Sequence, residues 1–430
     1  MEEFFLNASA ATSAAGSGLL DFTLASLYDD LPSARARYAE LSSSLSQLPE
    51  IGDKEVFFFR VPGRIELCGN HLDHQQGHVI AAAIDRDIAA CAAAAEGDTV
   101  AVHSTGYPQE HVPLSSLSPD TAGDSCAGAL IRGVLFYLRE HGYRIGPFSA
   151  CTRSQIPGGA GLSSSAAFEV LIGLVTSHLY NGGEIPLQTL AEAGRFAENE
   201  FLGKPSGLMD QLACATGGVV LIDLAEKPTV RQLPALTTDT GHSLVIVEAG
   251  DSHAALGSAY ASIVEEMASV ARFFGKRTLR EVGRAAFFDA LPDLLTLSDR
   301  AILRAFHYFE EFDRVTALAG ALRSGQFEAS CQILRKSGLS SLCFLQNGAP
   351  PGAAERQPVP LVLAICEHLL GDRGAYRLHG GGFGGTVLAL VPDDQLSHFL
   401  NTFSLLFGEG RAYPVHEQRA GAILLPSPDR

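Results

Sequence analysis

Glycine and serine are concentrated in residues 157–167, which have the sequence PGGAGLSSSAA. Glycines at positive φ allow successive backbone N–H groups to point to one side, and the serines that follow are expected to begin a helix. The N-terminus of a helix offers unpaired N–H groups and a favourable dipole to an anion, and serine hydroxyls can bind phosphate or Mg²⁺. The segment therefore predicts a phosphate-binding loop, with an ordinary glycine turn and serine N-cap as the alternative. It is not a Walker A loop, because it lacks the sequence Gly-Lys-Ser/Thr.

A second group of polar residues lies between two expected strands, in residues 60–77, RVPGRIELCGNHLDHQQG. Charged residues next to glycines in such a place suggest a loop that lines a pocket. There, Arg64 can stabilise developing negative charge, while His71 and Asp73 can hydrogen-bond to a polyol. Ordinary loop histidines are one alternative, and a metal site is another, although its spacing fits no zinc signature. The ligands of that alternative site would come from Cys68, His71, Asp73, His74 and His78.

A carboxylate follows a tight turn in residues 197–211, AENEFLGKPSGLMDQ. The helix that precedes the turn is expected to end at Gly203, and residues 205–207 form the turn. Asp210 then begins an apolar segment, where a carboxylate can act as a base or as a metal ligand. The alternative is that Asp210 is only a helix N-cap.

Residues 377–386, RLHGGGFGGT, place five glycines in six positions between strand-like flanks. A turn with so few side chains lets the backbone come very close to a neighbour. Taken alone, the pattern predicts either ligand binding or tight packing.

The elements that must position these segments alternate between helical and strand-like patterns, so the sequence predicts an α+β or mixed α/β fold. The pattern changes near residue 224, and we therefore expect two domains, 1–225 and 226–430. Strands are expected at residues 56–60, 79–95, 218–223, 244–248 and 421–425, with a strand–turn–strand at 375–391. Helices are expected within 1–50 and at 127–143, 163–180, 186–201, 255–274, 277–289, 298–324 and 358–370.

Composition narrows the class of protein. The chain has 430 residues, of which 46% are hydrophobic and 18% charged, enough for two domains with apolar cores. Its net charge of −17 argues against a protein that grips nucleic-acid backbones, and no apolar run is long enough to span a membrane. The acidic N-terminus and the 8 scattered cysteines are typical of a cytoplasmic protein with reduced thiols.

The order and spacing of the four segments resemble the galactokinase branch of the family typified by galactokinase, homoserine kinase, mevalonate kinase and phosphomevalonate kinase. Residues 161–166 match the family's Gly-Leu-Ser-Ser-Ser-Ala motif, and residues 377–385 match its Arg-Met-Thr-Gly-Gly-Gly-Phe-Gly-Gly motif. Residues 197–211 match Ala-Glu-His-x-Phe-x-Gly-x-Pro-Cys-Gly-Ile-Met-Asp-Gln without a gap. The family's first motif corresponds to residues 62–74.

The resemblance implies the family fold, in which an N-terminal α/β domain with a ribosomal-protein-like unit and a C-terminal ferredoxin-like domain enclose the active site. It implies a kinase that uses ATP and Mg²⁺ to phosphorylate the anomeric (C1) hydroxyl of a sugar, which in galactokinases is galactose. Sugar and ATP would then be its partners, without nucleic acid or membrane, and the protein would be a monomer or a weak homodimer. A histidine followed seven residues later by a tyrosine, another family feature, corresponds to His253 and Tyr260.

The resemblance also implies roles for individual positions. Asp210 corresponds to the catalytic aspartate and Arg64 to its charge partner. Ser164 or a neighbouring serine would hold Mg²⁺ together with Glu198. The residues that would wrap the phosphates of ATP are Gly158, Gly159, Gly161, Ser163, Ser164 and Ser165. The residues that would bind the sugar are Asn70, His71, Asp73, Gly207 and Tyr260.

Three positions depart from the family pattern. Asn70 replaces the glutamate that contacts the C6 hydroxyl, Glu66 replaces an asparagine, and Ser206 replaces a cysteine. A neutral amide at position 70 could donate to a C6 carboxylate, which a glutamate would repel. The Asp-His-Gln ending of the first motif also resembles plant galacturonate kinases, so galacturonate or another galactose-like sugar is an alternative substrate.

Two alternatives from other classes stay open. One is a sensor that binds sugar and ATP without turnover, as some members of this branch do. The other is a metal-dependent hydrolase built on His71, His74 and His78.

Overall fold

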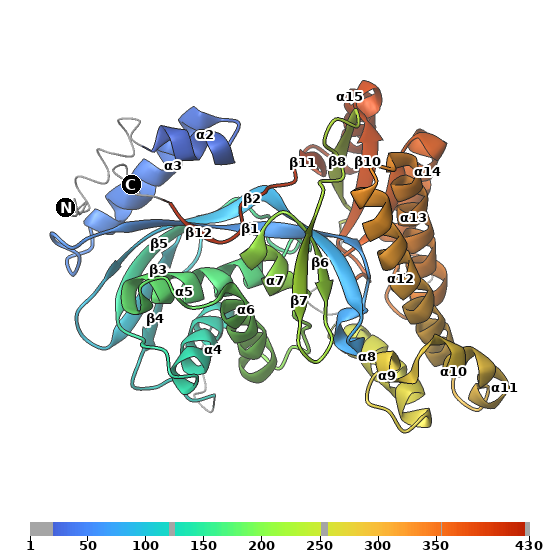
Figure 1. The fold of residues 1–430 in the computed structure, drawn as a ribbon. Helices are drawn as coiled ribbons and strands as arrows, with labels where there is room; N and C mark the ends of the chain where they lie inside the picture. The colour runs from blue at the N-terminus through green and yellow to red at the C-terminus, as the bar shows by residue number, and fades with distance from the viewer. Residues whose placement is uncertain (1–19, 120–124, 251–256, 354, 426–430) are drawn as a thin grey trace.

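The computed structural model describes residues 20–119, 125–250, 257–353 and 355–425. Its strands form two sheets, one of eight strands and one of four, with helices packed on both (Figure 1). The fold is therefore mixed α and β, as the sequence predicts. In these four stretches of chain, no helix combines the length and apolar character needed to cross a membrane.

The eight-stranded sheet is built around two long antiparallel strands, β1 (Phe57–Cys68) and β2 (His78–Ala94). β2 is long enough to pair with β6 along its first part and with β5 along its second part. Its residues are mostly small and apolar because helices cover both faces of the sheet. The other strands are β3 (Thr99–Ser104), β4 (Glu110–Pro113), β5 (Phe148–Ser154), β6 (Val219–Asp223), β7 (Thr229–Leu233) and β12 (Ile423–Leu424).

Four helices of the first half of the chain pack on one face of this sheet, on the lower side in Figure 1. They are α4 (Cys126–Glu140), α5 (Ser164–Asn181), α6 (Leu187–Phe196), which continues into the π-helical turn η2 (Ala197–Phe201), and α7 (Met209–Thr216). The opposite face is covered by α2 (Asp21–Leu27) and α3 (Leu31–Ser46).

A buried cluster of charges ties α3 to this sheet. Asp87 of β2 is fully buried and accepts hydrogen bonds from Arg37 of α3 at 2.6 Å and from Arg60 of β1 at 2.5 Å. Tyr28 donates a third hydrogen bond to the same carboxylate, at 2.8 Å. One carboxylate is thus the counter-charge of two buried guanidinium groups.

The second sheet is antiparallel and has the order β11 (Ala412–Val415), β8 (His242–Glu248), β10 (Thr386–Pro392), β9 (Ala375–His379). α14 (Pro358–Leu370) and α15 (Leu396–Phe407) bury one face of it in an apolar cluster. Its other face packs against α13 (Phe327–Ser340), which is followed by the π-helical turn η4 (Ser341–Leu345). The long helix α12 (Asp299–Arg323) packs on α13 and also contacts β1, β2 and β7 of the first sheet. The remaining helices are α8 (Gly257–Phe273), α9 (Leu279–Val282), α10 (Arg284–Asp289) and α11 (Leu291–Leu294).

The chain passes from the first sheet to the second between Leu233 and His242, and it returns to the first sheet after Val415. One apolar cluster includes residues from both sheets, among them Val79 of β2 and Leu388 of β10. The two lobes therefore share part of their core. The division at residues 225 and 226 stays a prediction.

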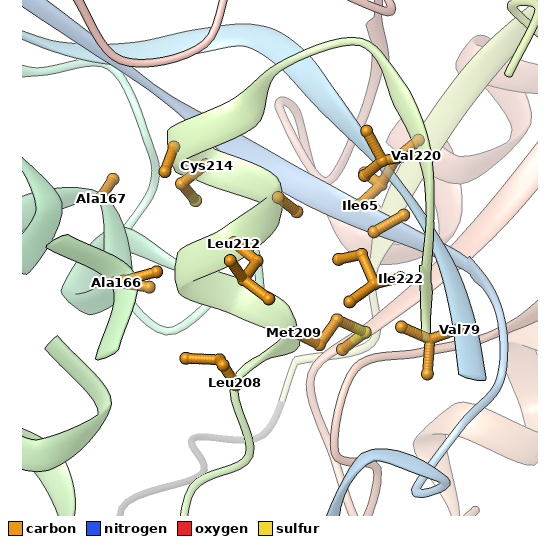
Figure 2. Packing of buried hydrophobic residues seen from close by; sticks show 14 of the residues in the cluster. Ile65, Val79, Ala166, Ala167, Leu208, Met209, Leu212, Cys214, Val220 and Ile222 are labelled. Carbon is orange, nitrogen blue, oxygen red and sulfur yellow. The ribbon is translucent and has the colours of Figure 1, made fainter. Parts of the chain in front are cut away.

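Apolar packing fixes the position of α7, the helix whose first turn contains Asp210 (Figure 2). Met209 and Leu212 lie in the same cluster as Ile222 of β6 and Ala166 of α5. α7 thus lies between β6 and the first turn of α5, which sets the place of any polar side chain that it carries.

The structure differs from the sequence prediction in the segment 60–77. The sequence predicts a loop there, but β1 continues through Cys68 and only residues 69–77 form a loop. The pairing of β1 with β2 changes register between Pro62 and Arg64, and such a bulge accommodates Pro62 and Gly63 inside a strand. The expected helix 277–289 is split into α9 and α10 at Gly283, whose φ is +77°.

Candidate active site

The four segments predicted from the sequence meet at one cavity of about 430 Å³. Its wall combines β1 and the loop after it, the glycine loop and first turn of α5, the turn before α7, Tyr260 of α8, and the glycines between β9 and β10. Gly158 is not among its lining residues, and His253 lies outside the described residues. The predicted residues that line it are Arg64, Asn70, His71, Asp73, Gly159, Gly161, Ser163, Ser164, Ser165, Glu198, Gly207, Asp210 and Tyr260.

Arg64 and Asp210 form an ion pair on the wall of this cavity. Nε and Nη2 of Arg64 donate to Oδ1 of Asp210 at 2.9 and 2.6 Å. Nη1 of Arg64 donates to the carbonyl of Gly161 at 2.6 Å. The guanidinium group therefore joins β1, the glycine loop and α7, and it holds the carboxylate in one orientation.

The Asp210 carboxylate is kept ionised by its surroundings. Burial works to raise its pKa, but the charge of Arg64 and a 2.7 Å hydrogen bond from Ser163 Oγ outweigh that effect, so the pKa lies below its ordinary value. Its place in the first turn of α7 also favours a negative charge. Asp210 is thus an ionised acceptor with one third of its side chain exposed to the cavity.

The glycine loop adopts left-handed backbone conformations at Gly159, Gly161 and Ser163, with φ of +76°, +70° and +63°. A backbone that enters the left-handed region at alternate residues can form a concave array of N–H groups that suits an anion. The serine is strained there, because a side chain disfavours positive φ, and its hydroxyl bonds to Asp210 instead of capping α5. Thr386 of β10 donates to the carbonyl of Ala160 at 3.0 Å, which ties the loop to the second lobe.

Glu198 lies beside the first turn of α5, on the π-helical turn η2. Its Oε1 accepts hydrogen bonds from Ser165 Oγ at 3.0 Å and from Lys204 Nζ at 2.5 Å. Its Oε2 accepts from Gln211 Nε2 at 3.3 Å, and the same amide donates to Glu169 at 2.9 Å. Burial and the nearby Glu198 raise the pKa of Glu169 well above its ordinary value.

The oxygen atoms at this place suit Mg²⁺, which binds carboxylates and hydroxyls together with phosphates. The serine that contacts Glu198 is Ser165, while Ser164 lines the cavity next to it. The carboxylate of Glu198 is 4% exposed and already pairs with a cation, the ammonium group of Lys204. The burial of this carboxylate and its pairing with an ammonium group both fit a cation-binding site.

The opposite end of the cavity contains His71, Asp73 and Tyr260. The rings of His71 and Tyr260 lie 4.7 Å apart, and His71 Nε2 is 2.9 Å from the carbonyl of Gly381. Burial lowers the pKa of His71 to about 4, so the imidazole is neutral. Burial, together with the charge of Asp210, raises the pKa of Asp73 to about 7.

Two glycines are needed for close approach at this end. A Cβ at Gly207 would lie 1.8 Å from Oδ2 of Asp73, and a Cβ at Gly381 would lie 2.4 Å from the ring of Tyr260. Both contacts are too short for any side chain. Glycine is therefore required at Gly207 because the Asp73 carboxylate lies against it, and at Gly381 because the Tyr260 ring lies against it.

Asn70 lines the cavity, but the protein uses its amide fully. Nδ2 donates to Glu66 Oε2 at 3.0 Å and to the carbonyl of Gly380 at 2.7 Å. Oδ1 accepts from Asn347 Nδ2 at 2.8 Å. Both N–H bonds of Asn70 therefore have partners within the protein.

In the sequence, Glu66 is only a departure from the family motif, yet its side chain lines the cavity too. Its other oxygen accepts from Arg377 Nη2 at 2.7 Å, and both side chains of this ion pair are 1% exposed. Relative to the family motif, the carboxylate and the amide have exchanged positions, and the hydrogen bond between Asn70 and Glu66 joins the two. The exchange keeps one carboxylate at this end of the cavity.

The histidines of the metal alternative do not converge. His71 Nδ1 and His74 Nε2 are 3.3 Å apart, but His78 stacks on Phe312, 3.8 Å between ring centroids, and its Nε2 contacts the Phe312 carbonyl. Within the part of the chain that the structure describes, no three His, Cys, Asp or Glu side chains are grouped as metal ligands. The geometry does not favour a hydrolase of this kind.

Two family models match the chain. The GHMP kinase N-terminal domain matches residues 129–218, which include the glycine loop, Glu198 and Asp210. The galactokinase galactose-binding signature matches residues 49–94, which include Arg64 and the loop that follows β1.

Solved structures show the same fold. Galactokinase from Lactococcus lactis, in complex with galactose, has a TM-score of 0.78 and 24% identity, covering 90% of this chain and 99% of that one. Mevalonate kinase from Methanococcus jannaschii has a TM-score of 0.59 and 18% identity, covering 85% of this chain and 99% of that one. Phosphomevalonate kinase from Streptococcus pneumoniae has a TM-score of 0.57 and 14% identity, covering 84% and 99%. The chain thus matches the GHMP kinase N-terminal domain and the galactokinase galactose-binding signature over these two segments, and it has the fold of the solved galactokinase and its relatives.

Proposed function

We propose that the protein is a galactose kinase that transfers the terminal phosphoryl group of ATP to the anomeric (C1) hydroxyl of galactose. The products are galactose 1-phosphate and ADP. The observation that carries the proposal is the Asp210–Arg64 pair, which lies between the glycine and serine cradle and the end of the cavity formed by the galactose-binding signature.

In this mechanism, Asp210 orients the C1 hydroxyl and accepts its proton as the oxygen–phosphorus bond forms. The bond between the transferred phosphorus and the leaving oxygen of ADP breaks in the same step. Because phosphoryl transfer has a loose transition state, positioning and charge neutralisation supply most of the rate enhancement. The backbone N–H groups of residues 158–161 and the guanidinium group of Arg64 provide both.

Mg²⁺ would be held by Glu198 with Ser165 or Ser164, and it would neutralise charge on the phosphates of ATP. Because Ser165 contacts Glu198 directly, Ser165→Ala should raise the Mg²⁺ concentration that gives half-maximal activity about tenfold. Ser164→Ala is the matched control and should change it less. Titration of activity with Mg²⁺ at fixed ATP checks the order, and a larger effect of Ser164→Ala would assign the ligand to Ser164.

The sugar end of the cavity favours a neutral sugar over a uronate. Glu66 and Asp73 contribute carboxylates there, the charge of Asp210 acts on the same end, and a sugar carboxylate would be repelled by these groups. The Asn70 amide has no N–H left to donate to such a group, since Glu66 and Gly380 accept both. These contacts support galactose rather than galacturonate.

The titration of Asp73 predicts a pH dependence of sugar binding. An ionised carboxylate accepts hydrogen bonds from sugar hydroxyls more strongly than a protonated one, and the pKa of Asp73 is raised to about 7. Since the ionised fraction falls as the pH drops below that value, the KM for galactose should rise about tenfold between pH 8 and pH 6. Measurement of KM across this range, with Asp73→Asn as the control that should show no such slope, checks the prediction.

A coupled assay of ADP release with galactose, galacturonate and other hexoses tests the proposal. We expect kcat/KM for galactose to exceed that for galacturonate more than tenfold, a difference of about 1.4 kcal/mol in transition-state binding. The reverse preference would replace galactose by the uronate. Binding of galactose and ATP without ADP release would instead identify a sensor.

We infer that the protein acts in the cytoplasm as a monomer or weak homodimer, on sugar and ATP, without nucleic acid or membrane. All eight cysteines are free thiols in the structure, and six of them are buried. This supports a reducing compartment.

A further inference from the structure

Lys204 is a cavity residue to which the sequence motifs assign no role. It lies on the turn between η2 and α7, after Gly203, whose φ is +63°. Its backbone N–H donates to the carbonyl of Glu198 at 3.0 Å, and its ammonium group lies 2.5 Å from Oε1 of the same residue. Lys204 is thus anchored to Glu198 by both its main chain and its side chain.

Among the residues that the structure describes, the only lysine or arginine side chains that line the cavity are those of Arg64 and Lys204. Arg64 is 5% exposed, and its donors are directed to Asp210 and to the carbonyl of Gly161. The Lys204 side chain is 56% exposed, and Glu198 accepts one of its three N–H bonds. Lys204 is therefore the cation on this wall that can take a further anionic partner.

The position of Lys204 restricts what that partner can be. Its ammonium group is next to Glu198 and Ser165, and its charge acts on both Asp210 and Glu169. In the reaction proposed above, the phosphoryl group must lie between the cradle at residues 158–165 and the acceptor oxygen held by Asp210. Lys204 borders that space.

We propose that Lys204 is a further catalytic residue, which binds the terminal phosphate of ATP and neutralises its charge during transfer. The assignment rests on the proposed kinase function and adds a second cation to Arg64. In the nucleotide-free protein the ammonium group offsets the charge of Glu198. Its flexible four-carbon stem then allows it to turn to the phosphate oxygens when nucleotide binds.

Comparison of ATP with ADP separates this role from a purely structural one. Loss of a contact to the terminal phosphate weakens ATP binding and leaves ADP binding unchanged. For Lys204→Met we expect the Kd for ATP, measured by calorimetry with Mg²⁺ and without sugar, to rise about tenfold. The Kd for ADP should stay within about twofold, kcat should fall about 100-fold, and the KM for galactose should not change.

Two further variants complete the experiment. Lys227→Met removes a lysine from an exposed turn and should leave both Kd values unchanged. Lys204→Arg keeps the charge and should recover most of the ATP affinity. Equal losses of ATP and ADP affinity in Lys204→Met, or no loss at all, would overturn the assignment.

The outcome for Lys204 is independent of the sugar. If the wild-type protein failed to phosphorylate galactose, the proposed function would fall, yet the difference between ATP and ADP binding would still decide whether Lys204 contacts the terminal phosphate.

Discussion

Asp210→Asn should lower kcat for galactose phosphorylation about 10³-fold and leave the Kd for ATP within about twofold of the wild-type value. Asparagine has the same shape but cannot accept a proton, and its amide cannot balance the charge of Arg64, which is 5% exposed. The proposed nucleotide cradle consists of backbone N–H groups of another segment, so we expect it to stay in place. ADP release and calorimetric titration with ATP measure the two quantities separately.

Asp223→Asn is a matched control for this variant. Asp223 also pairs with an arginine, Arg280, and its side chain is 36% exposed against 33% for Asp210, but it lies outside the cavity. We expect its kcat to equal that of the wild type. Near-normal turnover in Asp210→Asn would remove Asp210 from the mechanism, and a similar loss in both variants would indicate a general effect of breaking ion pairs.

Asp87→Asn should destabilise the first lobe by about 3–5 kcal/mol, because it leaves Arg37 and Arg60 buried without a counter-charge. Urea denaturation followed by circular dichroism measures the loss. Asp394→Asn breaks a pair with Arg373 on the surface and should change the free energy of unfolding by less than about 1 kcal/mol. Equal effects of the two substitutions would contradict the role of burial.

The destabilisation by Asp87→Asn should depend on pH. Burial raises the pKa of Asp87, but the charges of Arg37 and Arg60 outweigh it and hold the pKa below its ordinary value. The carboxylate therefore stabilises the folded state above the pKa of an unfolded aspartate, about 3.9. The contribution is lost as the pH falls further, through the folded pKa. The difference between variant and wild type should thus be full at pH 7 and shrink in acid.

The sequence predicts which segments line the cavity better than it predicts the elements around them. Gly159 and Gly161 can be recognised in the sequence as loop residues because positive φ and close backbone approach need glycine. Asp210 can be recognised as a candidate base because it follows a tight turn. β5 is missed because Ser149 and Thr152, which are polar, are buried together with apolar neighbours, so the strand shows no clear alternation.

The sequence does not predict α13, because some of its residues are selected for contact with the second sheet and not for helix propensity. Gly338 lies inside the helix, although glycine disfavours helices, because a Cβ there would lie 2.9 Å from Cβ of Arg377. This contact is made with β9, about forty residues later in the chain, so no local sequence pattern can predict it. α7, with 8 residues, is too short for helical periodicity to be visible.

The sequence also does not predict the ion-pair partners of Glu66 and Lys204, because these pairs depend on how the chain folds. Glu66 meets Arg377, which is 311 residues away in sequence, and spacing along the chain contains no sign of that pair. Lys204 lies next to Glu198 because the chain turns at Gly203, after η2, so that the Lys204 N–H donates to the carbonyl of Glu198. Motif comparison treats that lysine as a variable position.

The pairing of β12 with β1 has a consequence for how the protein is made. Arg60 of β1 donates to the carbonyl of Ala420 at 3.1 Å, across 360 residues of sequence, and β12 covers the same edge of β1. During synthesis that edge presents unpaired N–H and C=O groups until residues 420–424 have left the ribosome, and exposed edges of this kind recruit other strands. Completion of the first sheet therefore waits for residues 420–424, and deletion of these few residues would turn the edge of β1 into a site of aggregation.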